Sequence, residues 1–218
     1  MRSALLVAAA GTGERLGRRP KGLLVLAGRP LLRWCLDALA GAVDEVVIAC
    51  PPGQEERFAE LAGPQARAVT GGSTRQESVR AALAASSGEL IAVHDVARPF
   101  ATRELLVRVL AAAATAGAAT AALPVVDTLV RETARGLETM DRDGVSAVQT
   151  PQAFLRAVLE AAHAQAARNG WQGTDDAGLA RRAGAHVALV EGERYNLKIT
   201  TPADLALADE IARWLASR

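Results

Sequence analysis

Two lysines are the first candidates for chemistry in this chain of 218 residues. Of its 25 Lys and Arg residues, only Lys21 and Lys198 are lysine. A lysine ammonium is a compact point charge that can enter a crowded site, whereas an arginine guanidinium is a broad planar fork. Chance explains either lysine alone as well as function does. Because both lie in motif-like segments, residues 8–17 just before Lys21 and 196–205 around Lys198, both are predicted to be functional.

The loop that contains the first lysine also carries glycines and an arginine. Gly11, Gly13 and Arg15 follow a strand-like run, and ligands of open α/β sheets bind beyond the carboxyl ends of the strands. Leu16 occupies the place of the third glycine of a dinucleotide fingerprint, and the Gly-Lys-Ser/Thr of a P-loop is missing. A solvated Arg in an ordinary turn is the alternative. The two cations, Arg15 and Lys21, favour a loop that holds a polyphosphate and neutralises its leaving charge.

A carboxylate ends the fourth strand-like run. Asp95 lies in VHDVARP (residues 93–99), at the carboxyl end of a buried strand. Mg²⁺ favours one or two carboxylates together with substrate phosphates, so Asp95 is predicted to bind this ion. The alternative is an ion pair with Arg98. His94 points to the opposite face under the two-residue period of a strand, and we expect it to be buried and hydrogen-bonded.

Two polar clusters lie at predicted helix starts. GGSTRQES (residues 71–78) opens a helix that Ser73 or Thr74 can cap, although the same helix N-terminus can also hold an anion or a nucleotide edge. TDDA (residues 174–177) places two acids at another helix start, where capping and the helix dipole account for them. His163 and His186 are isolated in the sequence and are predicted to be structural or solvent-facing.

Short apolar runs alternate with helical patterns along the chain. This alternation predicts an α/β fold with a parallel sheet covered on both faces. The polar, weakly periodic residues 126–149 are predicted to form an arm that protrudes from a single domain of residues 1–218. The predicted strands are 4–10, 45–50, 66–70, 90–95, 118–125 and 186–190, and the predicted helices are 31–40, 55–62, 75–85, 102–116, 151–169, 175–183 and 203–216.

Composition excludes several classes of protein. The net charge of +1 gives no global field that would attract nucleic acid or a membrane surface. Cys35 and Cys50 are too few for a disulfide framework and are predicted to be buried. No apolar run reaches the length of a membrane span, and the strand-like start of the sequence leaves no room for a signal peptide. We therefore expect a cytoplasmic protein without membrane or nucleic-acid partners.

Taken together, these segments resemble the nucleotidyltransferases, most closely the 2-C-methyl-D-erythritol 4-phosphate cytidylyltransferase family of the non-mevalonate isoprenoid pathway. The matching segments follow the family's order over essentially the whole chain: AAAGTGERLG, PKG, GGSTRQESV, VHDVARP, PVVDT, the pair Asp141-Arg142, QTPQAF, TDDA and NLKITTPADL. The resemblance implies a Rossmann-like mixed, mostly parallel sheet with a dimerisation arm. It also implies transfer of CMP from CTP to a sugar-alcohol phosphate, Mg²⁺ as cofactor, and a homodimer.

The resemblance also implies a role for each site residue. Arg15 and Lys21 would stabilise the charge at the α-phosphorus of CTP. Arg142 and Lys198 would position the sugar phosphate with Thr128 beside it, Arg142 reaching into the partner's site. Asp95 would bind Mg²⁺. The residues implied for the nucleotide pocket are Ala9, Ala10, Gly11, Gly13, Gly71, Ser78, Asp95 and Arg98.

Three departures from the family pattern lie near these positions. Gly22 replaces a frequent Gln, Val96 replaces a frequent Ala, and Leu129 and Val130 precede the first basic residue of the arm, Arg131. The last change leaves the acceptor contacts of the arm open. None of the three touches the cationic site residues themselves.

Three other functions remain as alternatives. A cytidylyltransferase for another polyol phosphate, such as ribitol 5-phosphate, would share the nucleotide half of the site. An NAD-dependent oxidoreductase would need an acidic residue about twenty positions after the glycines, where residues 30–34 have none and Asp37 comes later, inside a helical pattern. A non-catalytic nucleotide-binding regulator would bind CTP without releasing pyrophosphate.

Overall fold

A seven-stranded sheet lies at the centre of the computed structural model, which describes residues 1–11, 13 and 19–217. The strand β10 runs antiparallel to both of its neighbours, β6 and β7, while the other neighbouring pairs of this sheet are parallel. The prediction of a mixed, mostly parallel α/β sheet is therefore confirmed. In spatial order the strands are β11 (Ala188–Glu191), β7 (Ala118–Pro124), β10 (Ser146–Leu155), β6 (Leu90–Asp95), β1 (Ser3–Ala8), β4 (Glu45–Cys50) and β5 (Ala66–Thr70).

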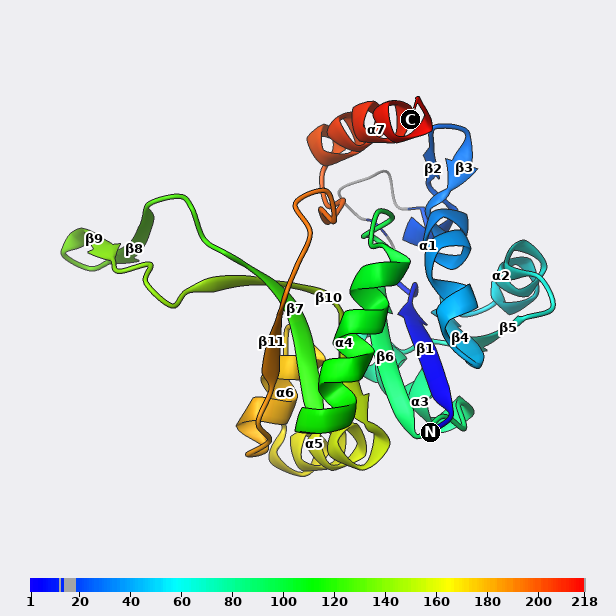
Figure 1. Cartoon of the computed structure of the whole chain (residues 1–218), viewed down its shortest axis with the longest axis horizontal. Helices are drawn as coiled ribbons and strands as arrows, with labels where there is room; N and C mark the ends of the chain where they lie inside the picture. Colours follow the sequence, from blue (N-terminus) through cyan, green and yellow to red (C-terminus); the bar gives the residue numbers. More distant parts are fainter. Residues whose placement is uncertain (12, 14–18, 218) are drawn as a thin grey trace.

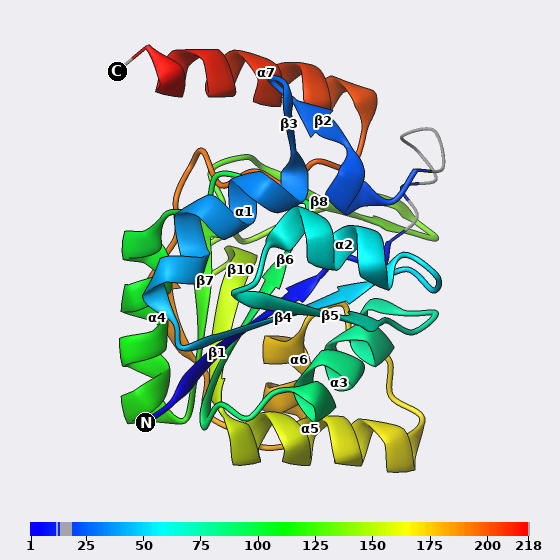
Figure 2. The same cartoon turned by 90° about the vertical axis from the view of Figure 1, so that its right-hand side faces the viewer.

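Helices cover both faces of this sheet, which is why residues 4–8 of the central strand β1 are apolar on both sides. On β1, Leu5 and Val7 face one hydrophobic cluster, and Ala4 and Leu6 face the other. The first cluster lies under α1 (Leu31–Leu39), α2 (Glu55–Ala62) and α4 (Arg103–Ala116). The second lies under α3 (Arg75–Ala85), α5 (Arg156–Asn169) and α6 (Asp176–Arg182). Figures 1 and 2 show the two groups of helices on opposite sides of the sheet.

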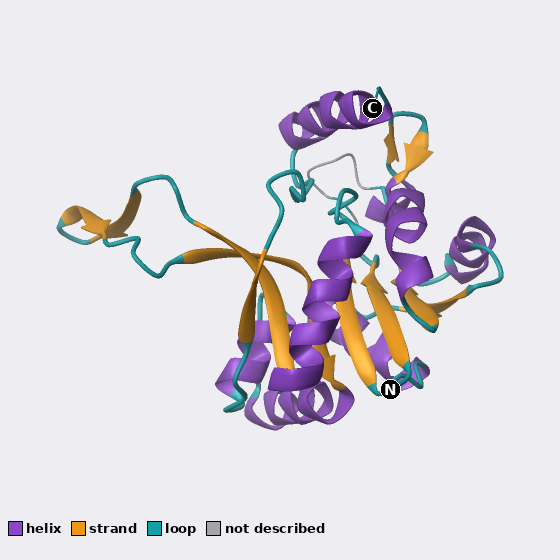
Figure 3. Cartoon of the chain, in the orientation of Figure 1, coloured by secondary structure: helices purple, strands orange, loops and turns teal. Residues whose placement is uncertain are grey.

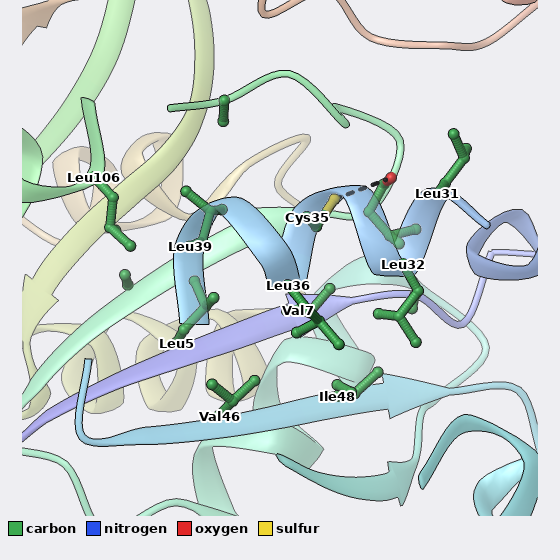
Figure 4. Close-up of a cluster of buried hydrophobic side chains, with 14 of the residues drawn as sticks. Leu5, Val7, Leu31, Leu32, Cys35, Leu36, Leu39, Val46, Ile48 and Leu106 are labelled. Carbon is green, nitrogen blue, oxygen red and sulfur yellow. Dashed lines mark hydrogen bonds between the residues drawn. The ribbon is translucent and has the colours of Figure 1, made fainter. Parts of the chain in front are cut away.

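The packing of α1 illustrates how the first face is filled. Leu32, Leu36 and Leu39 of this helix lie above Val7 of β1 and its neighbours on β4 (Figure 4). Cys35 is buried in the same cluster and its thiol donates to the Val96 carbonyl oxygen at 3.6 Å. Both cysteines are free and buried, as predicted.

Side-chain caps fix where helices α3 and α4 begin. Thr74, rather than Ser73, caps α3 and forms a reciprocal capping box with Glu77. Thr102 caps α4, as its position in the sequence predicts. Each cap satisfies a backbone N–H that has no partner within the helix.

Residues 126–145 form the arm. The hairpin of β8 (Leu129–Thr133) and β9 (Gly136–Met140) projects away from the body of the chain (Figures 1 and 3). Val130 and Leu137 are exposed on it. The expected end of the arm at residue 149 is too late, because β10 already pairs with β7 from Ser146 onward and Gln149 is 7% exposed.

The predicted helix over residues 151–169 is wrong in its first five residues. Here β10 continues to Leu155, and α5 begins at Arg156. Pro151 resembles the proline of a helix first turn, but it lies where the register of β10 against β7 shifts, between Val148 and Gln152. A strand accepts proline at such an irregularity because no ladder N–H is required there.

Two short strands and the last helix lie together at one end of the sheet. The short strands β2 (Val25–Leu26) and β3 (Arg29–Pro30) pair with each other and lie beside α7 (Pro202–Ala216). The Ala27 N–H donates to the Asp209 carboxylate at 3.0 Å, which ties the β2–β3 turn to this helix. Two 3-10 helices, Lys21–Leu23 and Ala40–Ala42, complete the chain's elements among the described residues. Within the same residues, no helix combines the length and apolarity that crossing a membrane requires.

Candidate active site

A pocket of about 220 Å³ opens at the carboxyl ends of β1 and β6, beside the N-terminus of α3. Ala8 and Asp95 are register partners at the ends of these parallel strands, so the loops that follow them share one edge of the sheet. That edge is where open α/β sheets bind ligands. The pocket is lined by Ala8, Ala10, Gly11, Lys21, Gly72, Ser73, Thr74, Arg75, Ser78, Asp95, Val96, Ala97 and Lys198.

The carboxylate of Asp95 binds two of the cations that line this pocket. Its Oδ1 accepts from Arg75 Nε at 2.7 Å, and its Oδ2 accepts from Lys198 Nζ at 2.7 Å. Burial opposes ionisation of Asp95, but the Arg75 and Lys198 charges outweigh it and hold the pKa of the carboxyl well below its usual range. Arg98 donates instead to the carbonyl oxygens of Asn196, at 2.7 Å, and Val148, at 3.3 Å.

The backbone of Asp95 is fixed from the opposite side of the strand. His94 is fully buried, and burial lowers its pKa to about 4, so the ring is neutral at pH 7. Its Nε2 lies 3.0 Å from the Arg98 carbonyl oxygen and must be the donor, which leaves Nδ1 to accept from the Thr150 hydroxyl at 3.1 Å. Thr150 Oγ1 in turn accepts the Asp95 N–H at 3.1 Å. The prediction of a buried, hydrogen-bonded His94 is confirmed.

Lys21 and Lys198 reach one pocket from opposite ends of the sequence. Lys21 Nζ donates to the Ile199 carbonyl oxygen at 3.4 Å, and its backbone N–H donates to Gly11 at 3.1 Å, so the first loop is tied to the segment that carries Lys198. Asn196, fully buried, holds that segment by donating to the Thr150 carbonyl oxygen at 2.8 Å. The sequence singled out both lysines, and the structure brings them together.

Gly71 does not line the pocket, but it precedes the pocket residue Gly72 and has no room for an added carbon. Ser78 Oγ accepts the Gly72 N–H at 3.1 Å and donates to the Thr74 carbonyl oxygen at 2.8 Å, which holds the glycine turn on the start of α3. A Cβ on Gly71 would lie 2.5 Å from Ala10 Cβ and 2.9 Å from Ser78 Oγ. Only glycine allows the two loops to approach this closely.

The other predicted site residues lie in three places. Ala9 is buried at the end of β1, and its N–H donates to Ala49 at 2.9 Å. Gly13 is buried with φ of 59°, and Arg15 lies outside the described residues. Thr128 and Arg142 are exposed on the arm and do not line the pocket, and the Arg142 guanidinium donates to the Val126 carbonyl oxygen.

Sequence reasoning did not identify Arg75 or its second partner, Asp176. Arg75 Nη1 lies 2.7 Å from Asp176 Oδ2. His163, predicted to be structural or solvent-facing, is structural: it is buried, with its Nε2 2.8 Å from Asp176 Oδ1. One feature of the sequence could have indicated an acidic partner for Arg75, because Arg75 is the first residue of α3. The helix dipole opposes a cation at that position unless an anion accompanies it.

Among the described residues that line the pocket, Asp95 is the one carboxylate that could bind a metal ion. Within the described ranges, no three His, Cys, Asp or Glu side chains gather as a metal-binding group. Mg²⁺ keeps waters and substrate phosphates as ligands and needs only one or two carboxylates. Asp95 is ionised and lines the pocket, so it is a carboxylate that would suit Mg²⁺ here, with substrate phosphates as the further ligands the ion would need.

Known proteins of one family match this chain over nearly its full length. Residues 3–213 match the family model described as IspD, 2-C-methyl-D-erythritol 4-phosphate cytidylyltransferase. The enzymes of that name from Deinococcus radiodurans and Thermus thermophilus are each 48% identical, covering 96% and 99% of this chain and 89% and 100% of their own. A crystal structure of the Thermus thermophilus enzyme superposes with a TM-score of 0.87 at 45% identity, covering 98% of this chain and 100% of its own. That of 4-diphosphocytidyl-2C-methyl-D-erythritol synthase from Anaerococcus prevotii gives 0.85 at 28% identity, with 98% of each chain covered.

The close packing around Gly71 generates a stability prediction. Gly71→Ala should lower the free energy of unfolding by about 1–3 kcal/mol, because the new methyl group overpacks against Ala10 and Ser78. Gly41→Ala is the matched control, since a Cβ there meets nothing within 4 Å, and its change should stay within about 0.5 kcal/mol. Urea denaturation measures both. Equal effects of the two substitutions would contradict the close approach.

Proposed function

The chain belongs to the 2-C-methyl-D-erythritol 4-phosphate cytidylyltransferase (IspD) family, and from that premise we propose that it transfers CMP from CTP to 2-C-methyl-D-erythritol 4-phosphate. The products are 4-diphosphocytidyl-2-C-methyl-D-erythritol and pyrophosphate, in isoprenoid precursor synthesis by the non-mevalonate route. The observation that carries the proposal is one pocket lined by Lys21, Arg75 and Lys198, in which Arg75 and Lys198 pair with the ionised carboxylate of Asp95. The family match favours this acceptor over another polyol phosphate such as ribitol 5-phosphate.

The reaction needs positioning and charge neutralisation more than proton transfer. A phosphate oxygen of the acceptor, already anionic, attacks the α-phosphorus of CTP, and the bond to the bridging oxygen of the pyrophosphate breaks. No general base is needed, which agrees with a His94 that is neutral and hydrogen-bonded away from the pocket. The protein's task is to hold two polyanions in line and to stabilise charge on the departing pyrophosphate.

The residues predicted from the sequence divide this task among them. Lys21, with Arg15, holds the phosphates of CTP and stabilises charge at the α-phosphorus. Lys198 positions the acceptor phosphate. Asp95 would hold Mg²⁺, which neutralises phosphate charge when bound. The proposed nucleotide pocket comprises Ala9, Ala10, Gly11, Gly13, Gly71, Ser78, Asp95 and Arg98.

The assembly we propose is a homodimer whose arms exchange site residues. Thr128 and Arg142 lie on a hairpin that projects from the body of the chain, outside the lining of the pocket (Figure 1). Val130 and Leu137 on the same hairpin are 51% and 71% exposed, and pairing with a second copy would cover them in a self-complementary contact. Arg142 and Thr128 would then serve the acceptor site of the partner. The proposed compartment is the cytoplasm, supported by two free cysteines, which suit a reducing environment.

The first prediction of this proposal is catalytic. With CTP, Mg²⁺ and 2-C-methyl-D-erythritol 4-phosphate, the protein should release pyrophosphate and form the CDP-alcohol. A pyrophosphate-release screen of four nucleoside triphosphates against several sugar and polyol phosphates, ribitol 5-phosphate included, measures it. A different acceptor with a much higher kcat/KM would overturn the acceptor assignment and leave the reaction class standing. CTP binding without pyrophosphate release from any acceptor would indicate a regulator instead.

The lysines give the second prediction. Lys21→Arg and Lys198→Arg preserve charge but place a broader fork in a crowded pocket, so each should lower kcat/KM by about 100-fold. The Lys21 variant should act mainly through kcat, and the Lys198 variant should also raise KM for the acceptor. Arg213→Lys, at an exposed pair with Glu210, is the control and should change neither parameter. Near-normal kcat/KM in both pocket variants would show that the choice of lysine does not matter there.

The third prediction tests the shared site by complementation. Arg142→Ala and Lys21→Ala should each be nearly inactive alone. After subunit exchange, a mixed dimer with shared sites has one site carrying both lesions and one carrying neither, so activity should recover toward half per mixed dimer. Differently tagged chains verify the exchange. Absence of recovery despite exchange would place Arg142 in the site of its own chain or outside any site.

A further inference from the structure

A continuous row of polar contacts, one hydrogen bond and three ion pairs, runs from the helices under the sheet into the pocket. His163 Nε2 lies 2.8 Å from Asp176 Oδ1, and Asp176 Oδ2 lies 2.7 Å from Arg75 Nη1. Arg75 Nε lies 2.7 Å from Asp95 Oδ1, and Asp95 Oδ2 lies 2.7 Å from Lys198 Nζ. Arg75 is therefore bound to both carboxylates, Asp176 on one side and Asp95 on the other.

Helix capping does not account for Asp176. Asp175 is the N-cap of α6, since its Oδ1 accepts the Gly178 N–H at 3.0 Å and its Oδ2 accepts from Gln152 at 2.7 Å. The carboxylate of Asp176 is fully buried and contacts Arg75 and His163 instead of the backbone N–H groups at the helix start. Burial opposes its ionisation, but Arg75 and His163 outweigh this and lower its pKa. A buried ion pair is often no more stabilising than apolar side chains of the same volume, which favours a role in positioning.

The position of Asp176 restricts what Arg75 can do. A guanidinium offers its donors in one fixed plane. With Nε held by Asp95 and Nη1 held by Asp176, the plane of Arg75 is set at two points, and the fork presents a single nitrogen to Asp95. Asp95 Oδ2 is thereby left for Lys198. Without Asp176, the Arg75 fork can turn and take both oxygens of Asp95 in a bidentate pair, in competition with Lys198.

We propose that Asp176 is a positioning residue for the catalytic pocket. Asp176 acts through Arg75 and keeps the Asp95 carboxylate shared between Arg75 and Lys198. His163 holds the other oxygen of Asp176 and completes the row. In its kinetic consequence this inference rests on the proposed cytidylyl transfer. Its structural content, a guanidinium immobilised by two carboxylates, stands without it.

Asp176→Asn tests the inference because it removes the charge and keeps the shape. It should lower kcat by roughly 10- to 100-fold, the range found for groups that orient a site residue, with a smaller change in KM for CTP. Asp175→Asn is the matched control one residue away, since Asn is an equally good N-cap, and it should stay within about twofold of wild type. A loss of kcat in the Asp175 variant as large as in the Asp176 variant would indicate a general effect of the helix start and overturn the proposal.

A double-mutant cycle separates positioning from a merely structural role. Arg75→Lys keeps the charge but cannot bridge two carboxylates. If Asp176 acts through Arg75, the double variant Asp176→Asn with Arg75→Lys should be no slower than Arg75→Lys alone. Multiplying effects on kcat would mean that Asp176 acts independently of Arg75, against the proposal.

A spectroscopic readout makes the inference testable whatever the enzyme's reaction is. In wild-type protein, NMR of the arginine side chains should show hindered rotation of the Arg75 guanidinium, with its signal assigned by loss in Arg75→Lys. Asp176→Asn should release that rotation, and Asp175→Asn should not. A wild-type protein that fails to release pyrophosphate would overturn the proposed function only. Unrestricted Arg75 in wild type, or no change in Asp176→Asn, would overturn the inference.

Discussion

The carboxylate that Arg75 and Lys198 share at Asp95 is the interaction on which the pocket depends. A buried charge must be paired and hydrogen-bonded to be tolerated, and here each oxygen of Asp95 has one cationic partner at 2.7 Å. The pairing keeps Asp95 ionised and at the same time places two cations at the edge of the sheet where a polyanion would bind. The same ion pairs therefore compensate the buried charge of Asp95 and place positive charge in the pocket.

The fold surrounds this interaction with rigid elements. The strand β6 is buried along its whole length and ends at Asp95. The antiparallel strand β10 beside it supplies Thr150, whose hydroxyl links the Asp95 backbone to His94. Each partner of Asp95 comes from a distant part of the chain, Arg75 from the start of α3 and Lys198 from the segment held by Asn196. The site is therefore a product of the tertiary fold and not of any one motif.

Local signals were sufficient for much of the sheet and its helices. The bounds of β4, α2, β5, α3 and β6 agree with those predicted, because each is a short apolar or amphipathic run bounded by turn or capping residues. The sequence predicts a helix over residues 151–155 because proline is common in the first turn of a helix. These residues form a strand because they pair with β6 and β7, which are distant in the sequence. The two lysines could be singled out because their type is rare in this chain.

Arg75 and Asp176 could not be found in the same way. Arg75 lies inside a segment that capping explains, and its partners are 20 and 101 residues away. Asp176 follows an aspartate that already serves as the N-cap. A single sequence reports which residues can form an ion pair, but which of its 24 acids and 25 bases meet is decided by the packing of α3, β6 and α6.

The ionisation state of Asp95 tests this account most directly. Carboxyl ¹³C NMR, with the Asp95 signal assigned by its loss in Asp95→Asn, follows that group as the pH is lowered. The account predicts that Asp95 keeps the chemical shift of an ionised carboxylate well below the ordinary aspartate pKa of about 3.9, down to the pH at which the protein unfolds. Titration of the folded protein at or above that ordinary value would show that Arg75 and Lys198 do not hold this carboxylate, and would contradict the account.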